Sequence, residues 1–93
     1  MVPEVRILLV PLMEKLLVHY FKDSSTLFMC AWDLDSNDLM VVFNSKAVWL
    51  YKKVPSYVHQ EFIDAHSAGA YFNKNIRNMY HSLCMYKEGT TVG

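Results

Sequence analysis

Residues 67–80 read Ser-Ala-Gly-Ala-Tyr-Phe-Asn-Lys-Asn-Ile-Arg-Asn-Met-Tyr, and this stretch decides how the rest of the chain is interpreted. Ser67 suits the position before a helix, because its hydroxyl can accept a hydrogen bond from a free first-turn amide. Apolar residues recur here at helical spacing and predict a core-facing stripe made of Phe72, Ile76, Met79 and Leu83. We therefore expect a helix from residue 67 to about residue 82.

One flank of this predicted helix carries polar side chains that suit an anion. Asn73 and Arg77 are four residues apart and are therefore neighbours, while Tyr80 lies between them and the apolar stripe. Gly69 leaves the backbone of the first turn uncovered, beside amides that favour a negative charge. Composition alone favours a core helix with a solvated flank, and a ligand site is the alternative.

The residues before this helix predict a β-meander and one further helix. Polar turns separate three strands, which are expected at residues 26–32, 39–43 and 47–51. Pro55 opens a helix that we expect to run to about residue 65. The predicted fold is therefore α+β: an antiparallel three- to four-stranded β-meander followed by two α-helices, with an extra apolar N-terminal segment.

The first 22 residues are apolar and stand outside this pattern. Residues 5–21 fit a helical template, and a strand near residues 15–21 is the alternative. Charged side chains within the run argue against a membrane span. We divide the chain into this N-terminal segment at 1–22, a domain at 23–86 and a loose tail at 87–93. Because 53% of this short chain is hydrophobic, we expect a homo-oligomer with the N-terminal segment as its contact.

Charge and potential metal ligands favour binding over catalysis. Residues 44–93 hold six basic and three acidic side chains, a mild indication of an anionic partner. Cys30, Cys84 and the four histidines lack metal-ligand spacing, so we expect no metal. We also expect no cofactor. Two isolated cysteines do not make a disulfide framework, so we expect reduced thiols and a cytoplasmic location. The three aspartates of one turn suit solvated charge better than acid–base chemistry, and the chain is not expected to be an enzyme. These are Asp33, Asp35 and Asp38.

From Ser24 to about Tyr80 the order of motifs resembles the KTSC domain. That small domain occurs at the C-terminus of some lysyl-tRNA synthetases and as a stand-alone bacterial or phage protein. The matching residues are Ser24-Ser25, Trp49-Leu50-Tyr51, Val54-Pro55, Tyr57, Ser67, Gly69, Tyr71-Phe72-Asn73, Ile76-Arg77 and Tyr80. Ala68 departs from the pattern, because the family often has a basic residue there. The resemblance implies nucleic-acid binding and no catalytic activity.

Aromatic and basic residues near the end of the third strand extend the candidate site. Trp49 and Tyr51 share one strand face, and Lys52 follows them. Rings beside cations can stack bases and hold phosphates, although alternating aromatics also pack ordinary sheets. The candidate ligand-binding residues are therefore Trp49, Tyr51, Lys52, Ser67, Gly69, Asn73, Arg77 and Tyr80.

Two functions stay open at this point. The first is a non-catalytic module for a nucleotide or single-stranded RNA or DNA. A specialised form would be a phage-type oligomer that sequesters nucleotide immune signals in the host cell cytoplasm. The second is a protein–protein interaction domain that uses the apolar N-terminal segment. Arg77 either fixes a phosphate, or bonds to backbone carbonyls or to an acid such as Asp33 and so holds the helix on the sheet.

Overall fold

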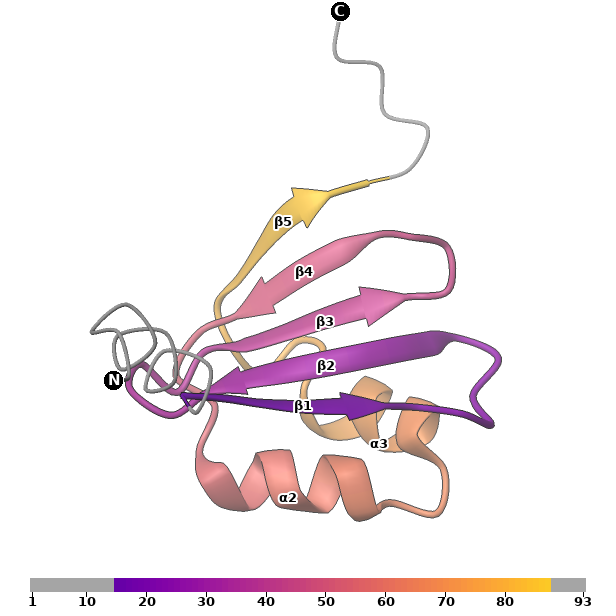
Figure 1. Cartoon of the computed structure of the whole chain (residues 1–93), viewed down its shortest axis with the longest axis horizontal. Helices are drawn as coiled ribbons and strands as arrows, with labels where there is room; N and C mark the ends of the chain where they lie inside the picture. The colour runs from indigo at the N-terminus through magenta and orange to yellow at the C-terminus, as the bar shows by residue number, and fades with distance from the viewer. Residues whose placement is uncertain (1–14, 88–93) are drawn as a thin grey trace, which may run out of the picture.

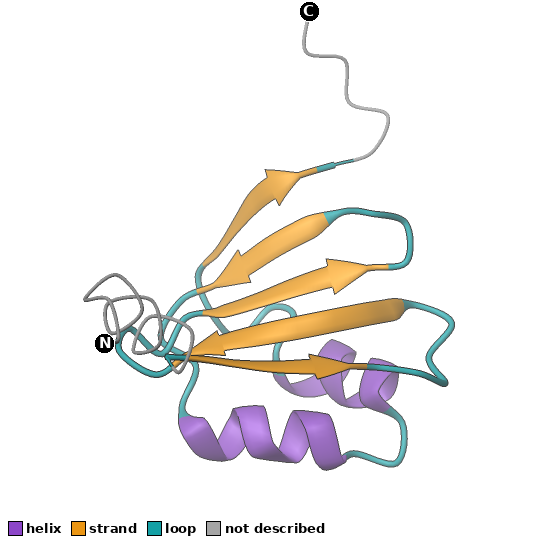
Figure 2. Cartoon of the chain, in the orientation of Figure 1, coloured by secondary structure: helices purple, strands orange, loops and turns teal. Residues whose placement is uncertain are grey.

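The computed structural model describes residues 15–87, which form a five-stranded antiparallel sheet with two helices along one face (Figure 1). The elements are β1 Leu16–Tyr20, β2 Leu27–Asp33, β3 Leu39–Phe43, β4 Val48–Tyr51, α2 Ser56–Asp64, α3 Ala68–Asn75 and β5 Ser82–Tyr86. The strands lie in the sheet in the order β1-β2-β3-β4-β5. The α+β class is confirmed, and Figure 2 shows the strands as one layer and the helices as another.

The three central strands and the first helix lie where the sequence predicts them. β1 confirms the strand alternative for the end of the N-terminal segment, and it pairs with β2 from Leu16↔Asp33 to Tyr20↔Met29. The remainder of the predicted helical template, residues 5–14, lies outside the described residues. The sheet therefore extends one strand further toward the N-terminus than a three-stranded meander.

The predicted helix from 67 to 82 is wrong in its second half. α3 ends at Asn75, and the amides of Ile76 and Arg77 both donate to the carbonyl of Phe72. Asparagine, which is a weak helix former, occurs at 73, 75 and 78 around this helix end. The chain then turns and forms β5, which pairs with the otherwise open edge of β4.

This change of direction divides the predicted apolar stripe. Phe72 and Ile76 are buried as predicted, at 4% and 0% exposure. Met79 is exposed in the turn after α3, and Leu83 lies on β5 opposite Leu50. The predicted core role of Met79 and Leu83 is therefore incorrect, because pairing with β4 replaces helical continuation.

The core lies between the sheet and the helices. Alternate strand residues point toward the helices, and the buried ones are Leu27, Cys30, Trp32, Leu39, Val41 and Tyr51. They meet Val58 and Phe62 of α2 and Phe72 of α3. Trp32 also donates its indole N–H to the carbonyl of Val54 at 2.8 Å, so its polar atom is satisfied inside the core.

Candidate ligand-binding groove

A cavity of about 570 Å³ opens beside α3, over the end of the sheet that β4 and β5 form. Five of the eight predicted site residues line it, namely Trp49, Tyr51, Gly69, Asn73 and Arg77. They come from a strand, a helix and the turn that follows the helix. The fold therefore gathers residues that are up to 28 positions apart in the sequence.

The aromatic side of this cavity is set by the register of β3 and β4. Trp49 lies opposite Val41 and Tyr51 opposite Leu39, so both rings share one face of β4, as predicted, and that face is the helix side of the sheet. Tyr51 packs edge-on against Phe72, with ring centroids 5.5 Å apart and planes at 81°. Phe72 thus anchors α3 to the sheet and fixes the distance between the aromatic strand and the polar helix flank.

Arg77 stands at the rim of the cavity, two residues after the end of α3. Its side chain has no ion pair and no hydrogen bond to any other residue of the described range 15–87. Asp33, the acid considered as its structural partner, instead accepts hydrogen bonds from the amides of Asp35 and Ser36. The guanidinium is therefore exposed and available to a ligand.

The charge of Arg77 reaches the Tyr51 phenol. Burial raises the pKa of Tyr51, and the positive charge of Arg77 acts in the opposite direction. Both residues line the cavity, so a guanidinium and a phenol border the same space.

A second cavity, of about 650 Å³, adjoins the first at the start of α3. Thr26, Gly69 and Asn73 line both cavities, so the two are adjacent along α3, and we call them together the α3 groove. Ser67 lines this second part and caps α3, because its Oγ accepts a hydrogen bond from the Ala70 amide at 3.3 Å. Lys22 also lines this part and supplies a cation.

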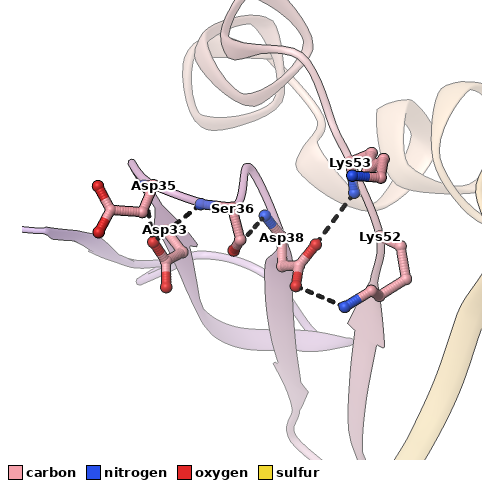
Figure 3. A network of polar contacts seen from close by, with 6 residues as sticks. All are labelled: Asp33, Asp35, Ser36, Asp38, Lys52 and Lys53. Atoms are coloured by element: carbon pink, nitrogen blue, oxygen red, sulfur yellow. Dashed lines mark hydrogen bonds and ion pairs between the residues drawn. The ribbon is translucent and has the colours of Figure 1, made fainter.

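Two predicted site residues lie away from the α3 groove. Lys52 directs its ammonium to Asp38, at 2.7 Å, in the network that Figure 3 shows. Tyr80 is half-buried against the core and lines neither cavity. Burial raises its pKa, and nearby Tyr57 acts in the same direction.

The acidic turn after β2 has a structural role, because its carboxylates accept hydrogen bonds within the turn and hold neighbouring segments. Asp33 accepts from two amides of its own turn, and Asp38 accepts from the Lys52 ammonium and the Lys53 amide (Figure 3). Lys15 pairs with Asp35 at 2.8 Å. Between residues 15 and 87, no three or more His, Cys, Asp or Glu side chains gather as metal ligands would.

Sequence reasoning missed several polar residues of the α3 groove. Asn78 and Ser82 line the first cavity, and both follow from the early end of α3 and the return of the chain as β5. Thr26 and Ser45 lie at the ends of strands, where polar residues are expected in any meander. The asparagines clustered at 73, 75 and 78 were the one available signal for the short helix.

The described residues thus form a small one-sided α+β domain with a polar and aromatic groove. The model of the KTSC domain family matches residues 23–80, which is more than half of the sequence. The chain belongs to the KTSC domain family. β1 and β5 fall outside the matched range but pair into the same sheet.

Solved structures include a relative that is similar over most of the chain. A crystal structure of a KTSC domain protein from Yersinia pestis is 24% identical, with a TM-score of 0.71, covering 76% of this chain and 99% of that one. This similarity supports the fold. No curated protein matches the chain. Within residues 15–87, neither helix has the length and hydrophobicity needed to cross a membrane.

Proposed function

We propose that the α3 groove binds a nucleotide or a short stretch of single-stranded RNA or DNA, without converting it chemically. The observation that carries this proposal is the exposed Arg77 guanidinium, which has no partner within residues 15–87 and stands beside Trp49 and Asn73 at a cavity. A guanidinium can hold a phosphate with two parallel hydrogen bonds. An aromatic face stacks on any base.

The size and shape of the groove support a ligand of this class. Each part lies in the range of about 300–1,000 Å³ that is typical of small-molecule sites. The side-chain amides of Asn73 and Asn78 can donate to and accept from a base edge. Lys22 and the first-turn amides of α3 can take a second phosphate at the far end of the groove.

The charge of the molecule favours a short ligand over duplex DNA. The formal net charge is zero, with nine basic and nine acidic side chains. A protein that grips a duplex neutralises many phosphates at once with a basic face. The α3 groove instead offers separate cations at its two ends, which suits one or two phosphates.

The proposal is one of binding without turnover. A protein that holds a nucleotide unchanged acts by sequestering or sensing it. Sequestration by an oligomer in a phage-infected cell is the specialised form of the proposal.

The binding test uses Arg77→Ala, Arg77→Lys and the matched control Lys74→Ala, which removes a cation from α3 outside the groove lining. The probes are a mixed-sequence single-stranded RNA oligonucleotide and a set of nucleoside mono- and triphosphates. Isothermal titration gives the affinity and thermal melting gives the stability. Mass spectrometry after denaturation identifies any nucleotide that co-purifies with the wild-type chain.

We expect the free energy of unfolding of Arg77→Ala to lie within about 0.5 kcal/mol of the wild-type value, because no internal hydrogen bond or ion pair is lost. It should bind at least about tenfold more weakly, which corresponds to about 1.4 kcal/mol for one lost charge-assisted contact. Arg77→Lys should recover only part of the affinity, since lysine lacks the planar fork. Undiminished binding by Arg77→Ala, or no binding of any probe by the wild type, would sink the proposal.

A further inference from the structure

The sheet face opposite the helices is apolar on every strand except at the end of β2, where Asp33 lies opposite Leu16. Register pairs place the outward residues beside one another across the whole sheet. They are Leu16, Val18 and Tyr20 of β1, Met29 and Ala31 of β2, Met40 and Val42 of β3, Val48 and Leu50 of β4, and Leu83 of β5. None carries a charge. We call these ten residues the open face.

Within residues 15–87 the open face is exposed at its edges, whereas Ala31 near its centre is only 6% exposed. Val18 and Tyr20 are 49% and 57% exposed, and Leu83 is 44% exposed. Phe28 extends the same surface, because its ring meets the Tyr20 ring edge-on with centroids 5.8 Å apart. Both helices lie on the opposite side, where Phe62 and Phe72 complete the core (Figure 2). An antiparallel sheet with one solvated face normally alternates apolar and polar residues, and this sheet does not.

The size of the open face can be compared with known interfaces. Five strands spaced by about 4.8 Å, each about five residues long at about 3.3 Å per residue, give a flat footprint of about 400 Å². Because side chains project from the sheet, the accessible area is larger than this flat footprint. The result approaches one partner's share of a small stable interface, which is about 600–800 Å².

We propose that the open face is the contact of a homodimer, in which the sheets of two copies pack face to face. Such a dimer is isologous, so the same uncharged surface meets itself across a two-fold axis without repulsion. Two packed sheets lie about 10 Å apart, with interdigitated side chains between them. The methionines at 29 and 40 can adjust their shape to such a contact.

A second copy fits the open face better than two other occupants. A segment as long as residues 1–14 covers about 21 by 10 Å even when helical, which is about half of the footprint. A membrane surface would require a rim rich in free basic side chains, whereas Lys15 is paired with Asp35 and Lys52 with Asp38. A second sheet matches the open face in width, length and twist.

The proposal is independent of the proposed ligand. The α3 groove and the open face lie on opposite sides of the sheet, because Trp49 and Tyr51 alternate with Val48 and Leu50 along β4. Dimerisation through the open face leaves the groove accessible in both copies. A failure of one proposal therefore leaves the other standing.

The test is light scattering on the full chain over a wide range of concentration, with Met40→Glu and the matched control Met79→Glu. Met40 lies on the central strand of the open face, between Ala31 and Leu50. Met79 is 66% exposed in the turn after α3, outside the strands of the open face. Val18→Glu at the edge of the open face serves as a second disrupting variant if Met40→Glu does not fold.

We expect a dimer for the wild type and for Met79→Glu, and a monomer with an unchanged far-ultraviolet circular dichroism spectrum for Met40→Glu. The oligonucleotide affinity of Met40→Glu should match that of the wild type. A wild-type chain that stays monomeric at every concentration would overturn the proposal. A dimer that persists in the folded Met40→Glu variant, or in Val18→Glu where Met40→Glu does not fold, would overturn it as well.

Discussion

His59 is buried in the core without a hydrogen-bond partner for its Nε2 atom among residues 15–87. It is 4% exposed, and its ring stacks on Trp32 with centroids 5.2 Å apart and planes at 13°. Burial lowers the pKa of His59, nearby His19 lowers it further, and Asp64 opposes both. The folded chain therefore holds this imidazole neutral, in the role of an aromatic core residue.

This arrangement predicts a pH dependence of stability. The unfolded chain takes up a proton at His59 as the pH falls below about 6.5, whereas the folded chain does so only at lower pH. The unfolded state then binds more protons, so the free energy of unfolding falls with decreasing pH, by at most about 1.4 kcal/mol per pH unit from this group. Urea denaturation at a series of pH values from neutral downward measures the slope.

The His59→Phe variant isolates that slope. Phenylalanine keeps the ring on Trp32 and removes the titrating group, so we expect a shallower loss of stability below about pH 6.5. His66→Phe, a substitution at an exposed position between the helices, should retain the wild-type slope. Equal slopes for wild type and His59→Phe would show that other groups carry the acid sensitivity.

At the scale of the element, α3 depends on one side chain for its start. Ser67 Oγ accepts a hydrogen bond from the Ala70 amide, whereas α2 begins after Pro55 with no side-chain cap. Ser67→Ala should lower the free energy of unfolding by about 1 kcal/mol, because a first-turn amide loses its acceptor. Ser56→Ala, at the uncapped start of α2, should change stability by less than about 0.5 kcal/mol. Thermal melts that rank the two variants in reverse order would contradict this assignment.

The sequence identifies where elements begin better than where they end. Pro55 and Ser67 act through local chemistry, and both helices start beside them as predicted. The helix end at Asn75 was missed, because Met79 and Leu83 continue the helical spacing of Phe72 and Ile76. The free edge of β4 recruits Ser82–Tyr86, and that pairing depends on tertiary structure that no local pattern contains.

The same reasoning explains which site residues were predicted. Trp49 and Tyr51 follow from strand alternation, and Asn73 follows from helical spacing, so all three line the α3 groove. Asn78 and Ser82 depend on the turn and on β5 and were missed. Lys52 was expected beside the rings, but the next residue of a strand points to the opposite face, where Asp38 holds it.

At the scale of the whole molecule, the two thiols report on different parts of the fold. Cys30 is fully buried on β2, and burial raises its pKa to about 12. Cys84 is exposed on β5. A thiol-reactive chromophore should therefore modify Cys84 rapidly in the native protein, and Cys30 only as fast as the core opens.

Cys84→Ser supplies the control for this experiment. The variant should lack the rapid phase and keep the slow one, and urea should accelerate the slow phase in proportion to the loss of stability. If Cys30 reacts rapidly in the folded Cys84→Ser variant, β2 must separate from the helices without global unfolding.

The order of the strands has a consequence for the assembly of the fold during synthesis. β1 to β4 pair only with their neighbours along the chain, so each hairpin can close as soon as its second strand has left the ribosome. The pairing of β4 with β5 spans both helices and must wait for them. Until β5 emerges, β4 remains an unpaired edge strand of the nascent meander. The strand that carries Trp49 and Tyr51 is then not yet bordered by β5.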